Sequence, residues 1–138
     1  MLRGTCACAR IRYDIRGELI GPVTYCYCWR CRKHSGSSFE TTAAVAAADF
    51  VLVAGEELLA SWESCPGVHR FFASCCGSPL FKRDDAAPRF LGFRLGTLDS
   101  DPAQKAGMHF LVGSKAPWVE IHDSLPQEAG GAPFGERD

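Results

Sequence analysis

The stretch from Cys26 to Cys31 reads CYCWRC and contains three closely spaced cysteines, Cys26, Cys28 and Cys31. A CxC spacing combined with a CxxC spacing is typical of zinc sites, in which thiolates surround a tetrahedral ion. Three ligands leave one position of the tetrahedron for water or substrate, so the motif favours an open, catalytic type of site. The alternative is a closed structural site whose fourth ligand is a distant His or Cys.

Five further cysteines lie outside this motif, at Cys6, Cys8, Cys65, Cys75 and Cys76. The first ten residues, MLRGTCACAR, contain no apolar stretch of signal-peptide length, and no run in the chain is long enough to span a bilayer. We therefore expect a cytoplasmic protein without membrane contact, in which thiols stay reduced. Eight cysteines in such a protein predict metal ligands or buried thiols rather than disulfides.

The composition is that of one globular domain. The chain has 138 residues, of which 46% are hydrophobic, enough for a core that folds without a metal. Fifteen basic and sixteen acidic residues give a net charge of -1. Because binding to a phosphate backbone requires a basic surface, we expect no nucleic-acid partner.

Glycine and proline recur along the chain and predict short strands joined by turns. The fold is therefore expected to be mainly β. Apolar alternation and branched or aromatic residues predict strands at residues 10–15, 50–53, 70–72, 90–95, 109–112 and 118–121. One short helix is expected at 30–37, and residues 41–48 (TTAAVAAA) are ambiguous. A tail at residues 127–138, rich in Gly, Pro and Glu, is expected to be disordered after a single domain over residues 1–126.

Five segments, in the same order along the chain, resemble the glutathione-dependent formaldehyde-activating enzyme family, which includes the centromere protein V proteins. GTCACA resembles the family's G-x-C-x-C-G start, CYCWRCRKHSG its CHC-x-x-CR motif, and FFASCCGSPLF its FC-x-x-CGS-x-L segment. GTLDSDP and HFLVGSKAPWVEIHDSLP resemble its carboxyl-terminal strands. The resemblance extends from residue 4 to residue 126.

The resemblance implies a β-tent fold, a zinc-ribbon-like arrangement of curved antiparallel sheets in a single domain. It also implies two zinc sites. The first CxC and the late cysteine pair imply a structural site on Cys6, Cys8 and Cys76. The middle motif, CYCWRC, implies the catalytic site on its three cysteines.

Two positions depart from the family pattern. Tyr27 stands where the family has His, and since that side chain is not a zinc ligand we expect only an indirect or surface effect. Ala73 stands where the family has the first cysteine of the late CxxC, so the structural site lacks one expected ligand. Three outcomes remain open: Cys75 replaces it, a His such as His69 or a water completes the site, or the site holds no metal.

The resemblance implies a zinc-dependent carbon–sulfur lyase that acts on a glutathione–aldehyde adduct such as S-(hydroxymethyl)glutathione. The basic residues Arg30, Arg32 and Lys33 would stabilise the anionic zinc–thiolate centre or hold the carboxylates of glutathione, unless they form only a solvated basic turn. His34 is a candidate acid–base or supporting residue. The alternative function is a non-catalytic zinc-binding module that recognises a protein partner. The oligomeric state stays open.

Overall fold

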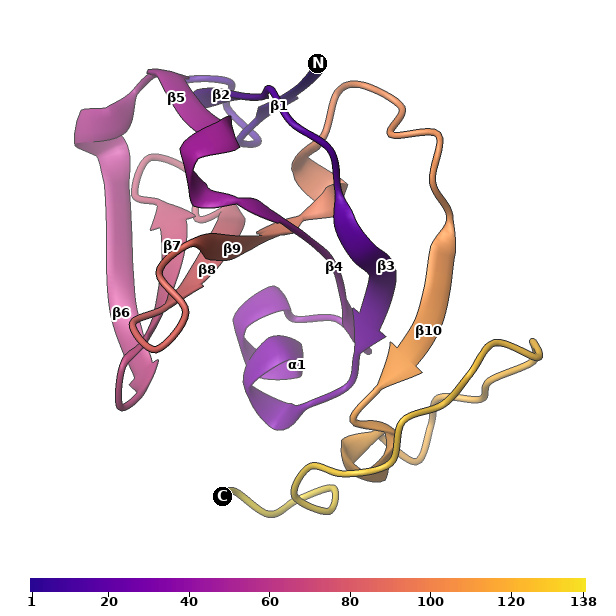
Figure 1. Cartoon of the computed structure of the whole chain (residues 1–138). Coiled ribbons are helices and arrows are strands. Elements are labelled where there is room, and N and C mark those ends of the chain that lie inside the picture. The colour runs from indigo at the N-terminus through magenta and orange to yellow at the C-terminus, as the bar shows by residue number, and fades with distance from the viewer. The chain divides into compact units, whose positions relative to one another are not determined.

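The computed structural model describes all 138 residues and contains ten strands, one α-helix and four short 3-10 helices (Figure 1). The expected mainly β class is confirmed. The chain divides into two compact units, a larger one of Met1–Gly21 and Ala43–Gln104 and a smaller one of Pro22–Thr42 and Lys105–Asp138. None of the helices has the length and apolar content needed to cross a bilayer.

The helix α1 runs from Trp29 to Ser35. The strands are β1 (Leu2–Thr5), β2 (Arg12–Ile15), β3 (Ile20–Cys26), β4 (Glu40–Ala46), β5 (Phe50–Ala54), β6 (Leu59–Cys65), β7 (Val68–Ala73), β8 (Pro79–Asp84), β9 (Phe90–Arg94) and β10 (Ala106–Phe110). The 3-10 helices are η1 (Ala47–Asp49), η2 (Glu56–Leu58), η3 (Leu95–Thr97) and η4 (Val112–Ser114).

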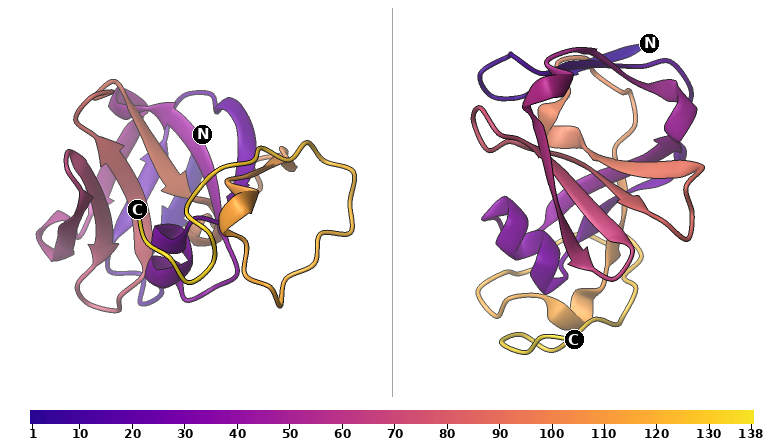
Figure 2. Two further views of the ribbon diagram at one scale, coloured as in Figure 1. Left: turned by 90° about the horizontal axis from the view of Figure 1, so that it is seen from below. Right: turned by 90° about the vertical axis from the view of Figure 1, so that its left-hand side faces the viewer.

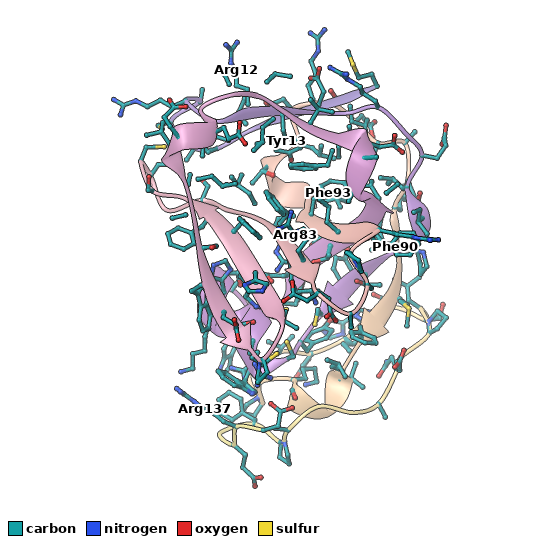
Figure 3. All side chains as sticks on the ribbon, turned by 60° about the vertical axis from the view of Figure 1, so that its left-hand side comes forward. Arg12, Tyr13, Arg83, Phe90, Phe93 and Arg137 are labelled. Carbon is teal, nitrogen blue, oxygen red and sulfur yellow. The ribbon has the colours of Figure 1, made fainter.

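In the larger unit, β1, β2 and β5 form a three-stranded antiparallel sheet. The second sheet of this unit has the order β4-β9-β8-β7-β6, and the pairs from β9 to β6 are antiparallel. Strand β2 follows the predicted alternation, because Tyr13 and Ile15 are buried whereas Arg12 is exposed. Figure 3 shows Arg12 and Tyr13 on opposite sides of the ribbon.

An aromatic core holds the two sheets of the larger unit together. The Tyr13 ring stacks on Phe50 with 4.6 Å between centroids. Phe50 lies 4.9 Å from Phe81, which stacks on Phe71 at 4.5 Å. Aromatic pairs at these separations contribute about 0.5–1.5 kcal/mol each beyond the area that they bury. The rings come from β2, β5, β7 and β8, so they connect both sheets.

In the smaller unit, β10 pairs with β3 in parallel, and β4, whose residues 40–42 belong to this unit, is the next strand on the other side of β3 (Figure 1). Helix α1 follows β3 after two residues and ends at Ser35, and the C-cap residue Gly36 has a left-handed φ of 68°. Glycine adopts this conformation without a Cβ penalty, and the Gly36 N–H donates to the Arg32 carbonyl at 2.8 Å.

Most predicted elements exist with shifted ends. The predicted strands at 10–15, 50–53, 70–72, 90–95 and 109–112 correspond to β2, β5, β7, β9 and β10, and the predicted helix corresponds to α1. The ambiguous stretch 41–48 lies mostly in β4. The predicted strand at 118–121 is wrong: these residues follow Pro117 as irregular chain, pair with no other strand, and leave Trp118 66% exposed. A branched and aromatic sequence forms a strand only beside a hydrogen-bonding neighbour.

The segment 127–138, for which the composition predicts disorder, has specific contacts in this structure. Gln127 forms a β-bridge with His109 of β10, and the Ser114 hydroxyl donates to the Ala132 carbonyl. Asp138 accepts hydrogen bonds from side chains of α1. Disorder of this segment in solution stays a prediction.

The substitution Gly4→Ala is expected to lower the free energy of unfolding by about 2 kcal/mol, because it overpacks the core. A Cβ at this position would overlap the Tyr13 ring and lie 2.7 Å from the Thr97 carbonyl oxygen. The ring cannot move aside easily, since its hydroxyl is hydrogen-bonded to the Thr97 side chain at 2.7 Å. Urea denaturation measures the effect. Gly96→Ala is the control, because a Cβ there meets no atom within 4 Å; equal unfolding midpoints would contradict this packing.

Candidate metal centres

The three cysteines of the CYCWRC motif lie at the junction of β3 and α1. Cys26 ends β3, Cys28 caps the first turn of α1, and Cys31 lies in the helix. Their Sγ atoms all lie within 4.8 Å of one another. The Cys31 N–H donates to Cys28 Sγ at 3.3 Å, so Cys28 serves as the side-chain cap of α1. The structure therefore brings together the three residues predicted for the open site.

The backbone around Tyr27 fixes this junction. The Tyr27 N–H donates to the Phe110 carbonyl of β10 at 3.0 Å, and this bond extends the parallel pairing of β10 with β3 by one residue. The Tyr27 carbonyl accepts a hydrogen bond from Arg32 Nε at 3.3 Å. Both backbone groups of the residue between Cys26 and Cys28 are therefore bonded.

The three thiols suit a cation. Hydrogen bonding to Cys28 and Cys31, followed by burial, raises the pKa of Cys26 well above its usual value. Three neighbouring thiolates are unfavourable without a compensating positive charge, which a divalent metal ion supplies. A tetrahedral zinc ion with Zn–S bonds of about 2.3 Å holds its sulfurs about 3.8 Å apart, and the limit of 4.8 Å between the observed sulfurs agrees with that spacing.

A second group consists of four cysteines of the larger unit, Cys6, Cys8, Cys75 and Cys76, with all Sγ atoms within 4.8 Å of one another. Cys6 Sγ lies 3.7 Å from Cys8 Sγ and 3.9 Å from Cys75 Sγ, and Cys8 and Cys75 are 3.3 Å apart. These distances bracket the tetrahedral spacing of about 3.8 Å. The first pair follows β1 and the second lies in the turn between β7 and β8.

The turn between β7 and β8 explains how Cys75 joins this group although Ala73 replaces the expected cysteine. Ala73 is fully buried, and its carbonyl accepts a hydrogen bond from the Gly77 N–H at 2.7 Å. The φ of Gly77 is 80°, so the chain turns sharply directly after the two cysteines. The Ser78 hydroxyl accepts from the Ala7 N–H at 2.8 Å and ties this turn to the loop after β1.

The two adjacent thiols have different electrostatic environments. Hydrogen bonds from Ser78 lower the pKa of Cys76 to about 6, which favours its thiolate at neutral pH. Hydrogen bonding to Cys8, the first of several causes, raises the pKa of Cys75 to about 12. His69 takes no part in this group; its Nε2 is 3.1 Å from Asp85 instead. Cys65, at the end of β6, belongs to neither group.

The three predicted basic residues, Arg30, Arg32 and Lys33, belong to α1. This helix lies next to the last residues of the chain (Figure 2). Arg30 donates to Asp138 Oδ1 at 2.8 Å, and its guanidinium lies 4.4 Å from the centre of the Trp29 ring. The Trp29 Nε1–H donates to the same oxygen at 2.7 Å. The hydrogen bond from Trp29, followed in size of effect by the one from Arg30, lowers the pKa of Asp138.

A small cavity of about 140 Å³ lies between α1 and this end of the chain. Its lining consists of Trp29, Arg32, Lys33 and residues 134–137. The Arg32 guanidinium lies over the Phe134 ring at 4.9 Å, and Arg137 lies over Trp29 at 5.0 Å. The cavity is therefore cationic and aromatic, a combination that suits a small anion-bearing ligand.

The two histidines near the motif have different partners. His34 Nδ1 lies 3.6 Å from Glu40 Oε1, and Glu40 is buried. His109, which the sequence places only at the start of a strand, is buried and contacts both the Tyr27 hydroxyl and Asp123. The sequence gives no direct sign of this network. The only indication in the sequence is Tyr27 within the cysteine motif. Of the two effects expected for it, a surface effect is excluded because Tyr27 is only 1% exposed, and an indirect effect stays a prediction.

Comparisons with known proteins agree with these features. A "Putative glutathione-dependent formaldehyde-activating enzyme" of Halomonas elongata is 30% identical over 128 residues, which cover 88% of this chain and 81% of that protein. A crystal structure of a Rhodobacter sphaeroides protein matches with a TM-score of 0.59 and 22% identity, over 72% of this chain and 89% of that one, and so shares the fold. The family model described as glutathione-dependent formaldehyde-activating enzyme matches residues 1–114. The chain therefore belongs to the glutathione-dependent formaldehyde-activating enzyme family.

Proposed function

We propose that this chain is a zinc-dependent carbon–sulfur lyase that acts on a glutathione–aldehyde adduct such as S-(hydroxymethyl)glutathione. In this reaction the C–S bond breaks, the hydroxyl oxygen becomes the carbonyl oxygen of formaldehyde, and the hydroxyl proton ends on the glutathione sulfur. The reverse direction forms the adduct. The single observation that supports the proposal is the group of three converging thiols in a member of this family.

Cys26, Cys28 and Cys31 would hold the zinc ion of this site. The group has three members, and zinc takes four ligands, so one position is left for a substrate atom. When bound, zinc acts as a Lewis acid and lowers the pKa of a thiol that binds to it. Free thiols and glutathione both require a reducing compartment, so we place the protein in the cytoplasm.

The basic surface of α1 would bind a carboxylate of glutathione. The structure provides an internal stand-in for this ligand, because the Asp138 carboxylate accepts hydrogen bonds from Trp29 and Arg30. Arg32 and Lys33 line the cavity next to this contact. The Asp138 side chain is 60% exposed, and ion pairs of exposed side chains contribute little to stability because water screens them. A substrate carboxylate can therefore displace the Asp138 carboxylate with only a small loss of free energy.

The group of Cys6, Cys8, Cys75 and Cys76 would hold a second zinc ion. Four protein thiolates complete a tetrahedron, which is typical of structural sites. Such a site would join the loop after β1 to the turn between β7 and β8, two segments about seventy residues apart in sequence. We therefore assign this group a structural role.

Metal analysis tests both sites at once. Protein purified without a chelator is expected to contain two zinc ions per chain, one for each group. Cys28→Ser is expected to lose the ion of the three-thiol site, and Cys75→Ser the ion of the four-thiol site, because each removes a ligand. Cys65→Ser is the matched control and should retain both ions. Full zinc content in Cys75→Ser would show that Cys75 is not a ligand.

The reaction is tested by exchange NMR on a mixture of glutathione and formaldehyde. The wild-type protein is expected to increase the exchange rate between the free aldehyde and its adduct, and Cys28→Ala is expected to abolish that increase. The comparison with the variant is necessary because the addition also proceeds without an enzyme. If wild type and Cys28→Ala give the same line widths as protein-free buffer, the lyase assignment is wrong. The non-catalytic zinc module that recognises a protein partner is then favoured.

Asp138→Asn is expected to lower the KM for the glutathione adduct about threefold and to leave kcat unchanged. The substitution removes a negative charge that competes with the substrate for Arg30, and the size follows from the small contribution of an exposed ion pair. Steady-state kinetics measure the change. Glu136→Gln removes the same charge beside the same cavity and serves as the control. Equal KM values for Asp138→Asn and wild type would exclude this surface as the carboxylate site.

A further inference from the structure

Tyr27 connects the three-thiol site to a buried histidine. It lies between Cys26 and Cys28 in sequence, and its side chain is almost fully buried. The Tyr27 hydroxyl is 2.7 Å from His109 Nδ1. A tyrosine hydroxyl can both donate and accept a hydrogen bond.

The second ring nitrogen of His109 is bound by a carboxylate. His109 Nε2 lies 2.9 Å from Asp123 Oδ1 and 3.1 Å from Oδ2. This hydrogen bond lowers the pKa of Asp123, which therefore stays ionised and only accepts. Nε2 therefore carries a proton and donates to Asp123, and in this Nε2–H tautomer Nδ1 accepts the hydrogen bond from the Tyr27 hydroxyl. The carboxylate fixes the direction of the Nε2 bond.

His109 itself is a rigid anchor. Its backbone N–H donates to the Pro126 carbonyl at 2.9 Å, and its carbonyl accepts from the Glu128 N–H at 2.8 Å. Its ring packs against Tyr25 and Tyr27 with centroid distances of 5.4 and 5.6 Å. The His109 side chain is only 4% exposed. Backbone, packing and Asp123 together hold the imidazole in one orientation.

Tyr27 is consequently held at three points. Its N–H is bonded to Phe110, its carbonyl accepts from Arg32, and its hydroxyl is bonded to His109. The rotation of the chain at Tyr27 determines the relative directions of the Cα–Cβ bonds of Cys26 and Cys28. A residue fixed at three points leaves this turn little freedom to open.

We propose that Tyr27, His109 and Asp123 form a positioning triad that keeps Cys26 and Cys28 in the metal-binding arrangement. The inference rests on the proposed function only in requiring that these cysteines bind a metal. Tyr27 and His109 touch neither substrate nor metal in this role. They act by fixing the backbone between two ligands before the ion binds, which lowers the conformational entropy lost on binding.

The metal affinity of the three-thiol site tests the triad. Tyr27→Phe removes one hydroxyl and keeps the ring, so the site is expected to bind Co²⁺ about tenfold more weakly in competition with a chelator. The ligand-field bands of Co²⁺ at this site are expected to shift, because the sulfur directions change. Cys28→Ala identifies which bands belong to this site, and the affinity of the four-thiol site is expected to stay unchanged.

Tyr25→Phe is the matched control. It removes the same hydroxyl two residues earlier on β3, from a ring that also packs against His109. Its Co²⁺ affinity and spectrum are expected to equal those of wild type. Unchanged affinity and bands in Tyr27→Phe would overturn the triad, as would an equal loss in Tyr25→Phe.

Asp123 allows a test at the exposed end of the network. Asp123→Asn is expected to weaken Co²⁺ binding in the same direction as Tyr27→Phe, and the double variant is expected to equal Tyr27→Phe alone, because Asp123 acts through the hydroxyl. Additive losses would overturn this coupling. Should Tyr27→Phe fail to fold, Asp123→Asn against wild type decides, since its side chain is 47% exposed. No Co²⁺ bands from the three-thiol site of wild type would refute the proposed function as well, which distinguishes the two failures.

Discussion

The close approach of cysteine sulfur atoms is the constraint on which the rest of this structure depends. Seven of the eight cysteines lie in two groups whose Sγ atoms are within 4.8 Å of one another. Thiolates at such distances repel each other unless a cation is present. Each group lies where the backbone turns, at the β3–α1 junction or in the turn between β7 and β8. The turns determine which sulfurs meet, so the local backbone is part of each site.

Local sequence patterns predicted most of the fold but not all of it. The alternation of polar and apolar residues around Tyr13 predicted β2 correctly, because one face of that strand is buried. The stretch that became β3 was missed because Gly21 and Pro22 resemble a turn, although both lie within the strand. The strand expected at 118–121 failed for the opposite reason, since a suitable composition found no pairing neighbour. Strand pairing is a tertiary property, which the local sequence reports only in part.

The candidate site, like the fold, could be predicted from the sequence only in part. The spacing of Cys26, Cys28 and Cys31 was sufficient to group them, because short spacings restrict where the chain can go. Spacing left the role of Cys75 open, since it depends on the turn at Gly77, whose φ is 80°. The contact between Tyr27 and His109 joins residues 82 positions apart, and it depends on the parallel pairing of β3 with β10. No pattern within either segment could have indicated it.

The two cysteine groups lie in different compact units, which agrees with the separate roles proposed for them. The four-thiol group lies in the larger unit, which also has the aromatic core of Tyr13, Phe50 and Phe81. The three-thiol group, the basic surface of α1 and the Tyr27–His109 contact all lie in the smaller unit. In the proposed assignment, a metal on the four-thiol group would join loops of the larger unit, and the three-thiol group of the smaller unit would keep one position for substrate. In the smaller unit, Tyr27 is fixed both by its hydrogen bonds and by the contacts of its ring with Phe39 and His109, which is why we propose that it holds the geometry of the neighbouring cysteines.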